Sequence, residues 1–235
     1  MAAQKHMTKK KSVRGGNAMQ IEVSNDGPYL VAGAVPLQEQ TIVSDTNGEA
    51  VGWRAGAKIE TTECYALCRC GQSGNKPFCD GSHAIVEFDG TETASRQNHL
   101  DHAEMTKGPA LAMADTPELC AGGRFCNAAD GTWTLVEQSD KTKAARLALR
   151  QACNCPSGRL TVYKKDGTAI EPVLSPSIGI VNDEAAREQG PLWVRGGIPI
   201  KSGDGQTYEI RNRVTLCRCG KSANKPFCDA NHSKG

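Results

Sequence analysis

The sequence predicts a small, β-rich α+β fold in which two copies of one unit form an internal pseudodimer around a small insert. Two repeated stretches indicate the copies: residues 27–37 are echoed by residues 190–200, and residues 68–83 are echoed by residues 217–232. Aromatic residues make up only 5% of the 235 residues, whereas there are 25 glycines. Such a composition supplies little material for a large apolar core, so small paired units are expected.

The repeats divide the chain into four predicted segments. These are a basic flexible tail (1–19), a first repeat (20–97), an insert (98–175) and a second repeat (176–235). Each repeat is expected to run as a strand, a glycine-containing bend and a further strand, followed by the cysteine-rich stretch. Val51–Arg54 and Tyr208–Arg211 are the predicted partner strands. Covalent linkage of two copies can replace the two-fold pairing of a homodimer.

The insert is predicted to contain one clear helix, Lys141–Ala152, because Ala144, Leu147, Ala148 and Gln151 share one helical face. Ser139 or Asp140 is expected to cap it. Thr132–Val136 and Leu160–Tyr163 are predicted strands, and residues 164–189 are read as a connector rich in Gly, Pro and Asp.

The two cysteine-rich stretches share the spacing C-x-C-x2-S-x3-P-x-C-D-x2-H. Three thiols and one imidazole per stretch point to an iron–sulfur or zinc site rather than calcium or magnesium. The eleven cysteines are expected to be reduced, because the basic N-terminus lacks the apolar run of a signal peptide. A cytoplasmic protein without membrane attachment is therefore predicted. The formal net charge of +2 gives no support for nucleic-acid binding.

Both stretches resemble the CDGSH iron–sulfur (NEET) family, in which two cysteines hold one iron of a 2Fe-2S cluster and a cysteine plus the histidine hold the other. The resemblance implies two clusters, held by Cys68, Cys70, Cys79 and His83, and by Cys217, Cys219, Cys228 and His232. Four further residues in these stretches are predicted to contact the cofactor: Ser73, Asp80, Ser222 and Asp229. The alternative is a pair of Cys3His zinc sites, although structural zinc usually has wider cysteine spacing.

Histidine ligation predicts distinctive redox behaviour. Replacing one thiolate by imidazole raises the reduction potential of 2Fe-2S centres. A ligating histidine also couples electron uptake to protonation near neutral pH, and protonation of its metal-bound nitrogen is expected to release the ligand in acid.

The insert resembles a divergent single-cluster bacterial ferredoxin, because Cys120 and Cys126 are followed later by Cys155-Pro156. Gly123 stands where a further ligand is expected. Cys120, Cys126 and Cys155 would suit a 3Fe-4S cluster, and Cys153 could complete a 4Fe-4S cluster. The alternative is an insert that has lost its cluster and acts as a spacer.

The predicted function is electron transfer by an iron–sulfur protein that is not an enzyme, since no nucleophile–base pair or phosphate loop is present. The alternatives are cluster storage or transfer, and redox or pH sensing, in iron homeostasis. The expected partner is a redox protein or an apo iron–sulfur acceptor, and a monomer with internal pseudo-two-fold symmetry is predicted. Three further expectations concern single positions. His99 and His102 should lie at the surface, and Cys64, the counterpart of Arg213, should be buried. Four basic residues of the cysteine-rich stretches are expected to be ordinary exposed bases, with tuning of the cluster potential by their charge as the alternative: Arg69, Arg218, Lys76 and Lys225.

Overall fold

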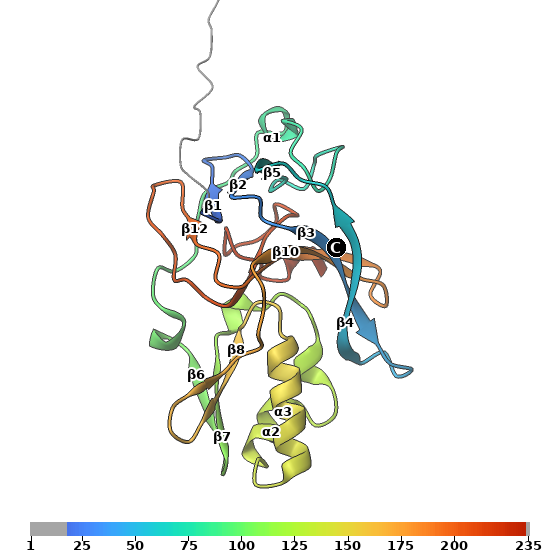
Figure 1. Cartoon of the computed structure of the whole chain (residues 1–235), viewed down its shortest axis with the longest axis vertical. Helices are drawn as coiled ribbons and strands as arrows, with labels where there is room; N and C mark the ends of the chain where they lie inside the picture. Colours follow the sequence, from blue (N-terminus) through green and yellow to red (C-terminus); the bar gives the residue numbers. More distant parts are fainter. Residues whose placement is uncertain (1–17, 234–235) are drawn as a thin grey trace, which may run out of the picture.

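The computed structural model describes residues 18–233. Most of the predicted basic tail, residues 1–17, and the last two residues lie outside the described part of the chain. Figure 1 shows the strands of both repeats at one end of the molecule and the elements of the insert at the other.

Strands dominate the two repeats. Those of the first repeat are β1 (Gln20–Val23), β2 (Tyr29–Ala32), β3 (Leu37–Ser44), β4 (Ala50–Ile59) and β5 (Cys64–Leu67). Those of the second are β10 (Ser177–Asp183), β11 (Glu188–Arg195), β12 (Ile200–Lys201) and β13 (Arg213–Leu216). Each repeat ends in one short helical turn that carries its motif histidine: α1 (Ser82–Ile85) and the 3-10 turn η4 (Asn231–Ser233).

The two repeats exchange a strand. One sheet has the order β12-β1-β2-β5, and another has the order β13-β11-β10-β3-β4. Strand β12 of the second repeat therefore pairs in parallel with β1, and β3 of the first repeat pairs in parallel with β10. The registers correspond, since Ile21 faces Ile200 and Ile178 faces Leu37. Each sheet is thus completed by the other half of the chain.

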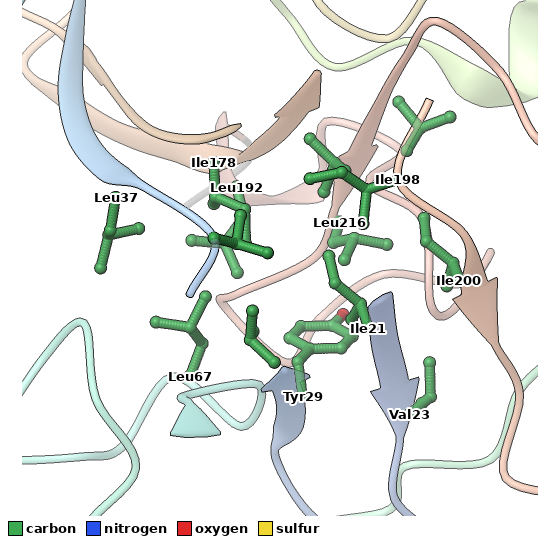
Figure 2. Packing of buried hydrophobic residues seen from close by; sticks show 14 of the residues in the cluster. Ile21, Val23, Tyr29, Leu37, Leu67, Ile178, Leu192, Ile198, Ile200 and Leu216 are labelled. Carbon is green, nitrogen blue, oxygen red and sulfur yellow. The ribbon is translucent and has the colours of Figure 1, made fainter. Parts of the chain in front are cut away.

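One hydrophobic core serves both repeats (Figure 2). Ile21 and Tyr29 of the first repeat are fully buried in the same cluster as Ile178 and Leu216 of the second. Truncating such a side chain to alanine typically costs about 2–5 kcal/mol. Because the core residues come from both halves, neither repeat has a separate core of its own.

The insert forms its own sheet, covered on one face by two helices. Its strands are β6 (Glu104–Lys107), β7 (Leu111–Asp115), β8 (Leu160–Lys164) and β9 (Ala169–Ile170), in the order β6-β7-β8-β9. Helices α2 (Thr132–Glu137) and α3 (Thr142–Asn154) pack on it through Leu135, Val136, Ala144 and Ala148. Three 3-10 turns connect these elements: η1 (His99–Asp101), η2 (Pro117–Leu119) and η3 (Phe125–Asn127).

The β-rich α+β fold and the strand at Leu160–Tyr163 are confirmed, but three local predictions are wrong. The predicted strand Thr132–Val136 is helix α2, because Thr132, Leu135 and Val136 form one buried helical face. The stretch Tyr208–Arg211 lies outside the strands, and β13 takes the predicted place beside β11. Residues 164–189, expected to be a connector, include β9, the whole central strand β10 and the start of β11.

The helix predicted at Lys141–Ala152 is present as α3, without the predicted cap. Its N-cap is Lys141, which makes no side-chain cap bond. Ser139 has another role, since its hydroxyl accepts hydrogen bonds from the amides of Ala110 and Leu111. Within the described part of the chain, no helix has the length and apolar character needed to cross a membrane.

Candidate metal centres

The first cysteine-rich loop begins where β5 ends. Cys68 follows Leu67 directly, and its Sγ lies 3.8 Å from Sγ of Cys70. Two thiolates bound to one tetrahedral metal at about 2.3 Å are about 3.8 Å apart, so this pair suits a single metal ion. Gly71 follows with φ +78°, which lets the backbone curl around the pair.

Cys79 and His83 form a second pair in the same loop. Sγ of Cys79 lies 3.3 Å from Nδ1 of His83, four residues later on α1. The imidazole therefore presents Nδ1 toward the cysteine, which leaves Nε2 as the outer nitrogen. Each loop thus offers two donor pairs, one of two thiols and one of a thiol and an imidazole.

The second repeat reproduces this arrangement. Cys217 and Cys219 have their Sγ atoms 3.6 Å apart, and Sγ of Cys228 lies 3.4 Å from Nδ1 of His232. Among the described residues, no three cysteine, histidine, aspartate or glutamate side chains gather as a group suited to one metal ion. The donors assemble as pairs instead.

The predicted cofactor-contacting residues brace the loops through backbone hydrogen bonds. Ser73 donates to the carbonyl of Phe78 (2.7 Å), and Ser222 donates to that of Phe227 (2.7 Å). Asp80 accepts from the amides of Gly74 and Ser82, and Asp229 accepts from those of Ala223 and Asn231. Hydrogen bonds from Ser82 hold the pKa of Asp80 well below its usual range. The same serine and aspartate positions therefore shape both loops.

Burial disfavours the negatively charged thiolate form of these cysteines. It is the main cause of the raised pKa of Cys70 and of the strongly raised pKa of Cys228. In the second site, a hydrogen bond from Cys219 lowers the pKa of Cys217 to about 6, and the same contact raises the pKa of Cys219. A bound metal cation would offset this effect, because its positive charge stabilises the thiolate and coordination deprotonates the thiol. The donor set therefore fits iron–sulfur ligation.

The two loops touch across the pseudo-two-fold axis. A Cβ added at Gly71 would lie 2.6 Å from the carbonyl oxygen of Cys219, and one added at Gly220 would lie 2.6 Å from that of Cys70. Both glycines also have φ +78°, so only glycine fits here. The metal-binding loops of the two repeats are direct neighbours.

Tyr29 of the first repeat forms hydrogen bonds to the second repeat, and its counterpart in the second repeat cannot form them in return. Its buried hydroxyl reaches the carbonyl oxygens of Cys217 (2.7 Å) and Pro226 (3.0 Å) in the other repeat. The repeat aligns Tyr29 with Leu192, which has no polar group. Sequence reasoning missed this role, although the exchange of tyrosine for leucine between the copies was a visible signal.

Three single-position predictions are wrong. Arg69 is 2% exposed rather than at the surface, because its guanidinium donates to the carbonyls of Ser24 and Gly90. His99 is buried, with Nε2 3.0 Å from the carbonyl oxygen of Arg159. Cys64 is exposed, whereas its counterpart Arg213 is buried against the insert, where it bonds to the carbonyls of Cys153 and Leu160.

Three cysteines of the insert line one pocket. Cys120, Cys126 and Cys155 enclose it together with Phe125, Pro156 and Arg159. Burial, together with the nearby Cys155 and Cys120, raises the pKa of Cys126 to about 11. Cys153 does not line this pocket. The structure therefore brings together the three predicted thiols and leaves the fourth candidate apart.

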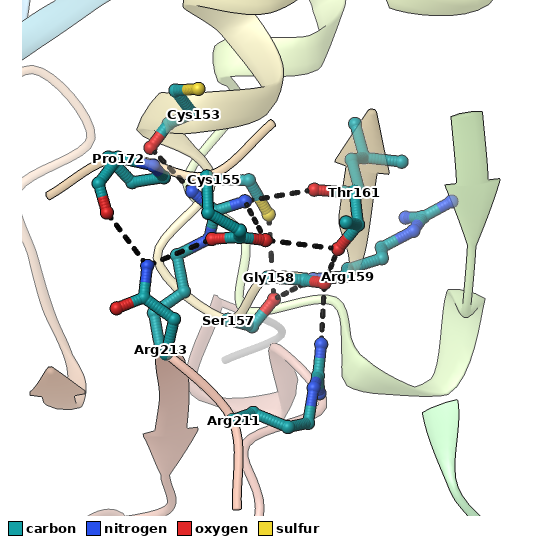
Figure 3. Close-up of polar contacts among 12 residues, drawn as sticks. Cys153, Cys155, Ser157, Gly158, Arg159, Thr161, Pro172, Arg211 and Arg213 are labelled. Carbon is teal, nitrogen blue, oxygen red and sulfur yellow. Dashed lines mark hydrogen bonds and ion pairs between the residues drawn. The ribbon is translucent and has the colours of Figure 1, made fainter. Parts of the chain in front are cut away.

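Arginines of the second repeat fasten the insert next to this pocket (Figure 3). Arg211 donates to the carbonyl of Gly158 (2.6 Å). Arg213, which is 1% exposed, donates to the carbonyls of Cys153 (2.9 Å) and Leu160 (3.1 Å) and pairs with Glu171 (3.3 Å). The backbone around Cys155 is thus held against β13.

Thiol–thiol and thiol–imidazole pairs on hydrogen-bonded loops of a β-rich fold indicate a metal-binding protein of the iron–sulfur class. Residues 26–84 and 189–233 match the family described as "iron-binding zinc finger CDGSH type". Residues 106–165 match the family described as "divergent 4Fe-4S mono-cluster". The chain therefore contains two segments that match the CDGSH family, with a segment that matches the divergent mono-cluster family between them. No curated protein matches the sequence significantly.

Proposed function

We propose that this chain is an electron-transfer protein with a 2Fe-2S cluster in each repeat and a third cluster in the insert. One observation carries the proposal: the three metal-binding loops lie in contact, one after another. Gly71 and Gly220 bring the two repeat loops together, and Gly122 of the insert lies against His232. Electron transfer slows steeply with distance, so contact between the loops favours exchange between the groups they hold.

The donor pairs support a two-iron cluster in each repeat. Cys68 with Cys70 suits one iron, and Cys79 with His83 suits the other, as the CDGSH resemblance implies. A zinc site would instead need its four donors around one ion. When bound, such a cluster exchanges one electron at a time, at a potential set by its ligands and surroundings.

Three thiols around the insert pocket support a 3Fe-4S cluster there. Cys120, Cys126 and Cys155 supply one thiolate each for three irons. Cys153 lies at the end of α3, outside the pocket lining. The 4Fe-4S form would need a fourth ligand from elsewhere.

The chain's own residues shape the sites rather than perform chemistry on a substrate. The serine and aspartate braces fix the loops, and burial of Cys228 and Cys217 excludes water from the thiol side of the second site. We therefore propose no enzymatic activity. The exchange of β3 and β12 within one chain supports a monomer, and we propose a cytoplasmic location with a redox protein as partner.

Cluster donation is the second candidate function, and one observation favours it. His83 lines an open surface pocket with Ala84, Glu87 and Phe88. An acceptor protein could reach a cluster there directly, which would suit storage, transfer or sensing in iron homeostasis.

Two assays on anaerobically purified protein separate the candidates. Stopped-flow mixing with a reduced flavoprotein should give rapid bleaching with full retention of iron and sulfide if the chain transfers electrons. Incubation with an apo-ferredoxin should leave iron on this chain. Movement of iron to the acceptor at a rate that matches or exceeds electron exchange would refute the electron-transfer proposal in favour of cluster donation.

A further inference from the structure

The insert lies against the histidine of one repeat only. A Cβ built at Gly122 would be 3.4 Å from Cβ of Ala230, 3.5 Å from Oγ of Ser233 and 3.9 Å from Nε2 of His232. Because Nδ1 of His232 faces Cys228, Nε2 is the outer nitrogen of this site. The backbone of the insert therefore lies next to the outer side of the imidazole of His232, which is half-buried.

No described residue covers the corresponding side of the first repeat. A Cβ built at Gly81, the counterpart of Ala230, would meet no atom of residues 18–233 within 4 Å. His83 borders a surface pocket rather than another loop. The two histidine sites thus have the same donors and different surroundings.

A difference between the two motifs coincides with this contact. The first motif has Gly81, whereas the second has Ala230, which keeps a left-handed φ of +64° although it is not glycine. Such a conformation costs about 1 kcal/mol or more in an alanine. The Ala230 methyl group packs toward Gly122, so the strained residue is the one that meets the insert.

Polar contacts anchor loop 120–123 of the insert on both sides. The side-chain amide of Asn224, in the second metal-binding loop, donates to the carbonyl of Glu118 (3.0 Å). Arg124 donates through Nε (3.1 Å) and Nη2 (2.6 Å) to Oδ2 of Asp183, whose side chain is 7% exposed. The loop is therefore fixed at residues that flank Gly122.

The strands beside the two sites show the same asymmetry. Arg213 begins β13, is almost completely buried and bonds to the insert. Cys64 begins β5 at the corresponding place and is exposed.

We propose that loop 120–123 of the insert is a fixed cover over the second CDGSH site, so that molecules in solution, including a redox partner, reach the chain at the first site. This inference rests on the two sites of the proposed function and assigns them different roles. The second site faces the insert, and the first faces the partner.

Hydroxyl-radical footprinting of the intact holoprotein tests the cover, with oxidation of each histidine followed by peptide mass spectrometry. His232 is expected to be oxidised at least about threefold more slowly than His83, because access to it requires local opening. Equal rates in the wild-type chain would overturn the proposal. Iron and sulfide content, measured on the same samples, tests the proposed function separately: slow oxidation of His232 in a chain without clusters would retain the cover and refute the electron-transfer role.

Matched variants test the cause. Asn224→Ala removes the hydrogen bond to Glu118 and is expected to raise the oxidation rate of His232, whereas Asn75→Ala at the corresponding place should leave that rate unchanged. Gly122→Leu should raise it, because a Cβ at Gly122 already lies 3.4 Å from Ala230 and the atoms beyond it would crowd that residue. Gly81→Leu, where a Cβ meets no described atom within 4 Å at a similar φ, should not. An unchanged His232 rate in both Asn224→Ala and Gly122→Leu would refute the role of this loop.

Discussion

Replacing Tyr29 by phenylalanine should weaken the opposite repeat rather than its own. The substitution keeps the buried ring and removes one hydroxyl, which lies 2.7 Å from the carbonyl oxygen of Cys217. A lost hydrogen bond costs about 0.5–1.5 kcal/mol, and leaving a buried acceptor unpaired brings the cost to about 1–3 kcal/mol. The second acceptor, the carbonyl of Pro226, keeps the amide of Cys217 as a donor, so we expect about 1–2 kcal/mol.

For a chain of this length, that loss corresponds to a Tm lower by about 2–8 °C. Thermal unfolding of the holoprotein measures the total effect, and amide hydrogen exchange locates it. Exchange should accelerate in residues 217–228 and stay unchanged in residues 68–79. Tyr65→Phe is the matched control, because its hydroxyl donates to the carbonyl of Val35 within the first repeat (2.8 Å). Faster exchange confined to residues 68–79, or none in either loop, would refute the cross-repeat role of Tyr29.

Three further predictions concern the metal sites and the insert. Cys120→Ser should remove the iron of the insert, whereas Cys153→Ser should keep it. The measured iron content should therefore fall from about seven to about four atoms per chain only in the first variant. Loss of iron in Cys153→Ser would indicate a four-ligand site. His83→Cys should lower the reduction potential of the first site and leave the second unchanged in a redox titration, and an unmoved potential would exclude His83 as a ligand. Burial and the nearby Arg211 lower the pKa of His99, against the opposing effect of Glu209. Below about pH 6.5 the unfolded chain therefore binds more protons than the folded chain, and the wild-type fold should lose stability there. His99→Gln should show a shallower loss of stability between pH 7 and 5, and an identical pH profile would contradict this assignment.

The repeats and their donor pairs could be predicted because their signals are local. A fixed spacing places Cys79 and His83 one helical turn apart, and a clear apolar face specifies α3. Helix α2 was missed because its six residues, with Trp133 and Leu135 two apart, imitate the alternation of a strand. A short apolar run of this kind does not distinguish the two structures.

Long-range relations could not be predicted from the sequence. The parallel pairing of Ile21 with Ile200 joins strands almost 180 residues apart, and no spacing rule connects them. Burial of Arg69 and His99 likewise depends on carbonyl groups that other segments bring to them. The cover at Gly122 depends on how the insert lies on the second repeat, which no motif within the insert specifies.

The exchanged strands β3 and β12 also bear on how such a chain can diverge. A homodimer built this way would carry every substitution twice, once at each symmetry-related position. Joining the halves in one polypeptide removes that constraint, so a residue useful on one side need not be tolerated on the other. Tyr29 opposite Leu192, Gly81 opposite Ala230 and Cys64 opposite Arg213 are differences of this kind. Fusion therefore lets one ancestral interface become two dissimilar surfaces while the shared sheets keep both halves folded.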